Sequence, residues 1–143
     1  MTVRGSGSPL KKNAVNPPSV FRSLEHGFSQ AVAASGRQTL YVSGQVAWDS
    51  QKRLVGGANL EEQARQAFTN LRAVVEAAGA TLADVVSVRI YIVDYRPEKA
   101  LPVGRVCREF FSGDVKPSST WVGVAALADP GFLIEVEATA VFD

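Results

Sequence analysis

Hydrophobic residues recur at helical spacing in one long stretch of the chain, between residues 60 and 78. The apolar members are Leu60, Ala64, Ala67, Phe68, Leu71, Val74, Val75 and Ala78. Steps of three and four residues place them on one face of a helix. Asn59 is suited to the N-cap and Gly79 to the C-terminal stop. The pattern therefore predicts an amphipathic helix that packs against a sheet.

Two other stretches alternate between apolar and other residues, as strands do. In Asp84–Val93, one face carries Val86, Val88, Ile90 and Ile92, and the other carries Val85, Ser87, Arg89 and Tyr91. In Phe132–Phe142, one face carries Phe132, Ile134, Val136, Ala138 and Ala140, and the other includes Glu135 and Glu137. Each of these strands is thus expected to have one apolar and one mixed face.

Shorter patterns predict four further strands and a second helix. The strands are expected at Phe28–Ala33, Thr39–Gly44, Gln45–Trp48 and Thr120–Ala125, and the helix from Pro102 to Gly113. The predicted order is β-β-β-α-β-α-β-β. This order indicates an α+β fold in which two helices cover one face of a mixed six-stranded sheet.

The dense pattern begins only near residue 19. Residues 1–18 mix Gly, Ser, Pro and Lys with scattered apolar residues, which cannot bury enough surface to offset the entropy lost on ordering. We expect a flexible N-terminal arm over 1–18 and a single domain over 19–143. Two helices leave the second sheet face bare and half apolar, which predicts a homo-oligomer with ligand clefts between subunits.

Composition narrows the chemistry. The formal net charge of +1 lacks the basic excess typical of nucleic-acid binding, so a nucleic-acid partner is not expected. The single histidine, His26, and single cysteine, Cys107, predict no metal site and no disulfide framework. No apolar run reaches the roughly 18 to 20 residues of a membrane span, and the first twenty residues lack the apolar core of a signal peptide. We expect a soluble cytoplasmic protein without a membrane partner.

A series of spaced motifs resembles the YjgF/RidA (endoribonuclease L-PSP) family. The motifs are Phe28-Ser29-Gln30-Ala31-Val32, Val42-Ser43-Gly44-Gln45, Gln63, Asn70, Asp94, Phe110-Phe111, Pro117 and Ile134-Glu135-Val136-Glu137-Ala138. They occur in the family's order over about residues 19–143. The resemblance implies a chorismate-mutase-like fold, a homotrimer with three clefts between subunits, and a small-molecule ligand.

The family's best-known members hydrolyse enamines and imines such as 2-aminoacrylate to a carbonyl product and ammonia, without a cofactor. Such chemistry needs a cationic clamp on the substrate carboxylate, a group that delivers water to the imine carbon, and a closed site. The resemblance places the clamp arginine two residues after Pro117, where this chain has Ser119. It also implies a tyrosine at Phe28, a small residue at Trp121 and an asparagine at Gly104. The resemblance thus predicts an arginine-less member with an altered substrate range.

Each candidate residue has a functional and a structural interpretation. Glu135 matches the family's water-positioning carboxylate, but an interface ion pair with Arg89 or Arg105 explains it equally. Ser43 and Gly44 match the strand end that lines the cleft, and Gly44 also suits a bend.

The remaining candidates lie on the strand that follows Pro117 and on the second helix. Ser119 and Thr120 could orient a polar ligand, or their hydroxyls could bond only to the backbone. Trp121 could stack on a ligand, or it could fill a subunit interface. Arg105 is a candidate to supply the missing charge from a neighbouring subunit, or a solvated surface residue.

The single cysteine and the single histidine are both interpreted structurally: Cys107 as a packed thiol and His26 as a surface-loop residue.

The leading function is imine or enamine hydrolysis. Glu135 is the predicted catalytic residue, and the predicted ligand-binding residues are Phe28, Ser43, Gly44, Arg105, Ser119, Thr120 and Trp121. A non-catalytic ligand sensor is the alternative. The endoribonuclease activity attached to the L-PSP name is disfavoured by the near-neutral charge.

Overall fold

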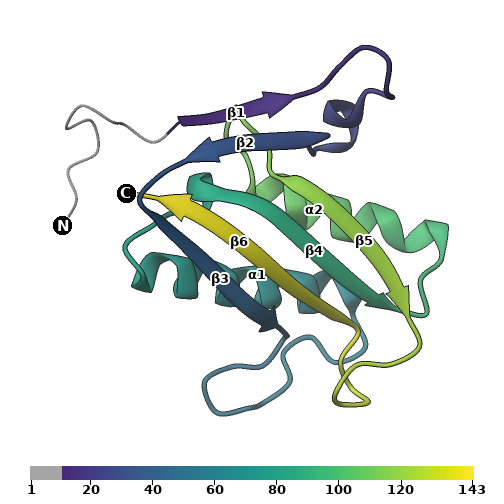
Figure 1. The fold of residues 1–143 in the computed structure, drawn as a ribbon. Coiled ribbons are helices and arrows are strands. Elements are labelled where there is room, and N and C mark those ends of the chain that lie inside the picture. The colour runs from purple at the N-terminus through teal and green to yellow at the C-terminus, as the bar shows by residue number, and fades with distance from the viewer. Residues whose placement is uncertain (1–10) are drawn as a thin grey trace.

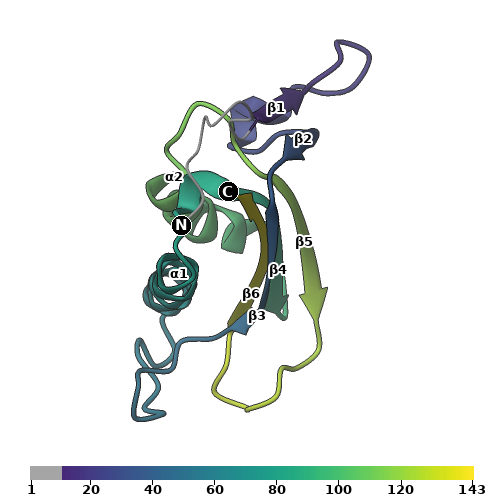
Figure 2. The same cartoon turned by 60° about the vertical axis from the view of Figure 1, so that its left-hand side comes forward.

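The computed structural model describes residues 11–143, which form a sheet with two helices on one face and a small ribbon beside it (Figures 1 and 2). The strands are β1 (Lys11–Val15), β2 (Ala31–Ser35), β3 (Gln38–Gln45), β4 (Val85–Val93), β5 (Ser118–Val124) and β6 (Ile134–Phe142). The helices are α1 (Leu60–Ala77) and α2 (Ala100–Phe110). Short 3-10 turns occur at Ser23–His26, Leu82–Asp84 and Pro97–Lys99. The predicted α+β class, the two helices and the count of six strands are confirmed. The order of element types also agrees, but only because β1, which was not predicted, replaces the predicted strand at Gln45–Trp48.

The six strands are divided into two groups. Four form a mixed sheet in the order β3-β6-β4-β5, in which only the β4/β5 pair is parallel, whereas β1 and β2 pair with each other as an antiparallel ribbon. The sequence analysis did not predict this division. Figure 2 shows both helices on one side of the four-stranded sheet and none on the other. We call the uncovered side the open face.

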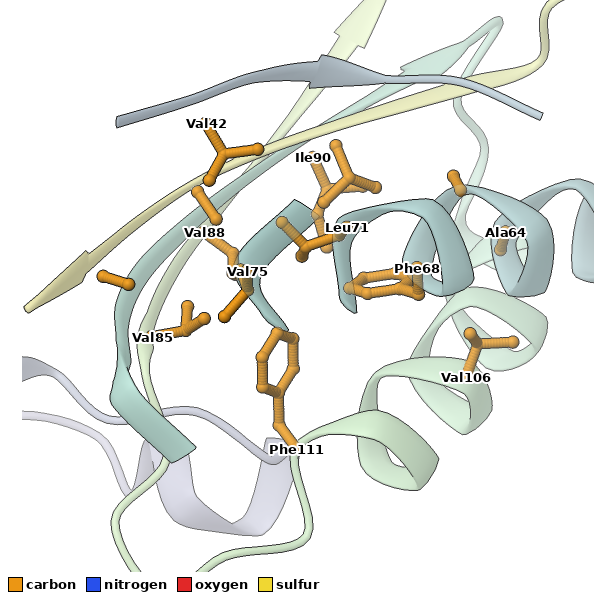
Figure 3. Close-up of a cluster of buried hydrophobic side chains, with 14 of the residues drawn as sticks. Val42, Ala64, Phe68, Leu71, Val75, Val85, Val88, Ile90, Val106 and Phe111 are labelled. Atoms are coloured by element: carbon orange, nitrogen blue, oxygen red, sulfur yellow. The ribbon is translucent and has the colours of Figure 1, made fainter. Parts of the chain in front are cut away.

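The core lies between that sheet and the helices (Figure 3). Helix α1 contributes Phe68, Leu71 and Val75, all fully buried, and its first turn is capped by Asn59, whose side chain accepts a hydrogen bond from the Glu62 amide at 2.9 Å. Gly79, with φ of +91°, follows the helix end as predicted. The alternation of β6 is also confirmed, because Ile134, Val136, Ala138, Ala140 and Phe142 are buried.

Two residues at the start of β4 depart from the predicted alternation. Val85 was assigned to the mixed face, yet it is fully buried in the core, and Val86 was assigned to the apolar face, yet it is only half-buried. The pairing of β4 with β6 shifts register between Val85 and Ser87, which indicates a bulge. A bulge inserts one extra residue, so residues before it point to the opposite side from the one that strict alternation assigns.

The predicted strand at Gln45–Trp48 is wrong. Strand β3 ends at Gln45, and Trp48 makes only an isolated bridge to Leu54. The carbonyls of Val46 and Trp48 instead accept hydrogen bonds from the side-chain amide of Asn70 on α1, at 2.9 and 2.8 Å. A helix side chain thus satisfies the backbone groups that a strand neighbour would otherwise occupy.

Strand β1 lies inside the segment predicted to be a flexible arm. It pairs with β2 from Lys11↔Ser35 to Val15↔Ala31, and the Lys12 ammonium donates to the Ala83 carbonyl at 2.7 Å. Four of its five residues are exposed, so it has no apolar alternation by which a strand is recognised. The part of the predicted arm over 1–10 lies outside the described residues. Within 11–143, no helix has the length and apolar character needed to cross a membrane.

Candidate functional site

A cavity of about 490 Å³ opens on the helix side of the sheet, beside the edge strand β5. Its wall combines the loop of residues 21–28, one side of α2 and the beginning of β5. Three residues predicted to bind ligand, Phe28, Ser119 and Trp121, line it together, as does Gly104 at the vacated asparagine position. The cavity thus brings together segments that are about ninety positions apart in the sequence.

Buried Ser29 fixes the loop to the start of β5. Its amide donates to the Pro117 carbonyl at 3.0 Å, its hydroxyl donates to the Lys116 carbonyl at 2.6 Å, and it forms a parallel bridge to Ser118. Gly27, whose φ of +85° favours glycine, then turns the chain over α2. These bonds place Phe28 at the cavity wall, where its ring meets that of Phe21 edge to face.

The register of β5 decides which of its side chains reach the cavity. Ser119 pairs with Val88 and Trp121 pairs with Ile90, so both point to the helix side. The Trp121 indole donates to the Ser119 hydroxyl at 3.2 Å. Thr120 pairs with Arg89 and points to the open face, so it does not line the cavity.

Glu135 and Gly44 meet on the open face instead. A Cβ on Gly44 would collide with the Glu135 carboxylate and would lie 2.6 Å from its Cδ, so only glycine permits this approach. Ser43, directly before Gly44, is exposed, and its carbonyl accepts a bond from the Gln45 side chain. Among residues 11–143, Glu135 has no hydrogen-bond or ion-pair partner.

The neighbouring carboxylate on β6 is fully engaged. Glu137 accepts a short hydrogen bond from the Tyr91 hydroxyl and pairs with Arg89 at 3.4 Å. The bond to Glu137 is the main reason that the pKa of Tyr91 lies above its usual range. The arginine that the sequence offered as a partner for Glu135 therefore binds Glu137.

Arg105 lies outside the cavity of its own chain. Its guanidinium pairs with Glu61 on α1 at 2.7 Å, and this bond is the main reason that the pKa of Glu61 lies below its usual range. The arginine of α2 that does reach the cavity is Arg108, which the sequence analysis did not single out. Its spacing of one helical turn from Gly104 was an available signal.

Cys107 and His26 both border the cavity. Burial raises the pKa of the Cys107 thiol to about 12, which fits the predicted packed and unreactive thiol. His26 sits in the loop of residues 21–28, with its ring against Phe21. In the part of the chain that the structure describes, no three His, Cys, Asp or Glu side chains are grouped closely enough to hold a metal ion.

Comparisons with known proteins agree on one family. The family described as Endoribonuclease L-PSP matches residues 22–142. A 2-iminobutanoate/2-iminopropanoate deaminase of Dermatophagoides farinae is 37% identical over 116 residues, which cover 81% of this chain and 86% of that protein.

Two solved structures place the fold in the same group. A Rid-family protein of unknown function, YyfB from Yersinia pestis, is 40% identical, with a TM-score of 0.87 over 91% of this chain and 98% of that one. RidA from a Psychrobacter species is 32% identical, with a TM-score of 0.66 over 80% and 88%. The chain therefore belongs to the endoribonuclease L-PSP family, which is also known as the YjgF/RidA family.

Proposed function

We propose that this protein is an enamine and imine deaminase, which hydrolyses a reactive imine to a carbonyl product and ammonia without a cofactor. The observation that carries the proposal is the cavity in which Phe28, Ser119 and Trp121 come together, because these are the positions that the family resemblance assigns to the ligand cleft. The similarity to a 2-iminobutanoate/2-iminopropanoate deaminase supports the same chemistry.

In this proposal Glu135 delivers the water. Its carboxylate accepts a proton from water while the water oxygen bonds to the imine carbon, and this proton passes to nitrogen to give a carbinolamine. The hydroxyl proton of the carbinolamine then moves to the nitrogen by way of the same carboxylate, so that the C=O bond forms, the C–N bond breaks and ammonia leaves. A carboxylate without competing partners is suited to this role, and Glu135 has none in residues 11–143. Because Gly44 has no side chain, the Glu135 carboxylate can occupy the space next to it.

The proposed site is completed by a second copy of the chain. Ser119 and Trp121 face the helix side of the sheet, whereas Glu135 lies on the open face, so the cavity of one chain does not contain its own Glu135. We propose a homotrimer in which the clefts lie between subunits. The open face also carries exposed Tyr41, an aromatic side chain of the kind that interfaces bury.

The substrate range of the proposed enzyme differs from that of members with an arginine at the start of β5. Ser119 offers one neutral hydroxyl there, and this hydroxyl already accepts the Trp121 indole N–H. A serine hydroxyl cannot replace the two parallel charged bonds of a guanidinium to a carboxylate. Small imino acids that rely on this position are therefore expected to be poor substrates.

The test couples the purified protein to an enzyme that releases 2-aminoacrylate or 2-iminobutanoate and compares ammonia release with the uncatalysed rate. For these small imines, which are expected to be poor substrates, the proposal predicts a modest acceleration that Glu135→Gln removes. Glu137→Gln is the matched control, because it changes a carboxylate on the same strand that is already bound to Tyr91 and Arg89. Acceleration that survives Glu135→Gln would contradict the assigned role.

One observation favours a second function, a non-catalytic sensor of a small ligand: no charged side chain occupies the Ser119 position at the start of β5. A folded oligomer that binds small acids but accelerates no imine hydrolysis would favour this alternative. RNA cleavage is disfavoured by the net charge of +1. Measured RNA binding whose affinity falls steeply as the salt concentration rises would favour this function instead.

A further inference from the structure

Arg108 crosses the wall of the cavity in the last turn of α2. A Cβ on Gly27 would lie 3.3 Å from the Arg108 Cγ, so the aliphatic stem runs over this glycine. Both terminal guanidinium nitrogens would lie 3.6 Å from a Cβ on Gly104. The side chain is therefore laid along two glycines and ends within the cavity lining.

The guanidinium of Arg108 lacks a partner in the part of the chain that the structure describes. Two other arginines at α2 form ion pairs: Arg105 binds Glu61 at 2.7 Å, and Arg65 binds Glu109 at 2.6 Å. Arg108 is exposed at the cavity, and its five N–H donors have no acceptor among the described residues. This distinguishes Arg108 from a surface arginine that serves a salt bridge between helices.

The other charges at the cavity do not neutralise Arg108. Glu25 is the one acidic residue in the described lining, and it pairs with Arg22 at 3.3 Å. Most of the wall around the guanidinium is apolar, formed by the rings of Phe28 and Trp121 and the side chain of Leu101. An apolar wall with one unpaired cation is the arrangement that binds an organic anion with a hydrophobic body.

Gly104 gives an independent reason to assign Arg108 a purpose. A glycine in the interior of a helix destabilises it relative to alanine, because the unfolded chain has more freedom to lose. Gly104 is buried in the middle of α2, and its φ does not require glycine. A Cβ there would lie 3.6 Å from both terminal guanidinium nitrogens, which is an ordinary contact, so side chains larger than that of alanine would occupy the space in which the guanidinium lies.

We propose that Arg108 is the anion-binding residue of the cavity and that it takes the carboxylate of an acid with an aromatic or branched apolar body. The inference deepens the proposed function, on which it rests for the identity of the ligand: the substrate would be an imino acid with such a side chain. Its carboxylate is bound from α2 rather than from the start of β5. The cavity volume of about 490 Å³ suits a larger ligand than a three-carbon imine.

The first experiment measures binding without catalysis. Isothermal titration calorimetry compares 3-phenylpropanoate with its neutral isostere 3-phenylpropanamide on the intact protein. We expect the acid to bind more tightly, and Arg108→Gln to weaken the acid by about ten- to a hundredfold while the amide is unaffected. Arg108→Lys should retain part of the affinity, because it keeps the charge but not the paired donors.

Arg65→Gln is the matched control, since it removes the same charge from a guanidinium that pairs with Glu109 outside the cavity. It should leave both affinities unchanged. The inference is overturned if Arg108→Gln binds the acid as well as the natural protein does, if the amide binds as tightly as the acid, or if neither binds. A loss with Arg105→Gln instead of Arg108→Gln would also overturn it.

The second experiment separates this inference from the proposed function. An amino-acid oxidase generates the imino acids of phenylalanine, leucine and alanine, and the protein's effect on their hydrolysis is followed by trapping the remaining imine. We expect faster hydrolysis of the two larger imines than of the alanine imine, because of the apolar wall, and slower hydrolysis of all three in Arg108→Gln, because each carries the carboxylate. Charge-dependent binding without any acceleration would refute the deaminase proposal and leave the assignment of Arg108 intact.

Discussion

The two faces of the four-stranded sheet handle charge in opposite ways. On the helix side, the cavity is walled by aromatic and aliphatic groups and holds one guanidinium, that of Arg108, without a partner. On the open face, Arg89 and Tyr91 are already bound to Glu137, and Glu135 is the carboxylate left without a described partner. The group suited to hold an anion and the group suited to activate water are thus presented on opposite sides of one sheet.

Stability should show the largest contrast between the faces, because neighbours on β4 point to different sides. Ile90 is fully buried under the helices, so Ile90→Ala should cost about 2–5 kcal/mol in the free energy of unfolding. Tyr91→Phe on the open face should cost far less. Urea denaturation at one fixed protein concentration measures both, because oligomerisation makes the apparent stability depend on concentration. Equal losses would mean that the open face is packed as tightly as the core.

The thiol of Cys107 tests whether the cavity wall is apolar. Burial raises the pKa of this thiol to about 12, from a usual value of 9.0. The thiolate fraction at pH 8 then falls by about a thousandfold, partly offset by the higher nucleophilicity of a more basic thiolate, for a net slowing of about fortyfold. Iodoacetamide labelling of native and urea-unfolded protein measures this ratio.

The pH dependence of stability follows from the same shift. Because the folded chain keeps the thiol proton that the unfolded chain releases, the free energy of unfolding should fall as pH rises from about 9 towards 12. Cys107→Ala should reduce this slope. Rapid native labelling at pH 8, or an unchanged slope in Cys107→Ala, would indicate a wetter cavity.

Gly44→Ala alters the open face alone. The added methyl would collide with the Glu135 carboxylate, so Glu135 must move. We expect about a tenfold loss in imine hydrolysis, with little change in the binding of 3-phenylpropanoate, because Arg108 is untouched. Gly113→Ala is a control, because no atom lies within 4 Å of the position of its Cβ. Equal activity of the two variants would remove Gly44 from the site.

The smallest effect is expected at Glu137. Glu137→Gln weakens the hydrogen bond that is the main cause of the raised pKa of Tyr91 and also removes the charge of Glu137, so this pKa should fall towards its usual value. Stability should change only slightly, because partly exposed ion pairs contribute little. Ultraviolet titration of the tyrosines follows the shift, with Tyr91→Phe identifying which tyrosine moves.

Regular burial was predictable from the sequence. The spacing of Phe68, Leu71 and Val75 identified α1, and the alternation of β6 identified its buried face, because each pattern repeats with the period of its element. Val85 escaped prediction because a bulge breaks that period. Strand β1 was not predicted because its residues are mostly exposed. Its backbone hydrogen bonds with β2 do not require a pattern of apolar side chains that the sequence would show.

Only part of the cavity lining was predictable from the sequence, and the contacts of its side chains were not. The resemblance identified Phe28, Ser119 and Trp121, which line one cavity. It could not separate Arg105 from Arg108, three residues apart on α2, because the choice depends on Glu61 of α1 and on the two glycines beneath Arg108. Those contacts arise from the way α1, α2 and the loop of residues 21–28 pack together, which no local pattern encodes.

The position of β6 has a consequence for how the chain is made. This last strand, Ile134–Phe142, lies between β3 and β4 in the sheet, so the two strands that flank it have no direct contact as sheet neighbours. Strands β3 and β4 can therefore join one sheet only after β6, which follows β4 by more than forty positions in the sequence, has been made and inserted between them. Pairings between strands that are far apart in the sequence form slowly, so assembly of this sheet should limit the folding rate.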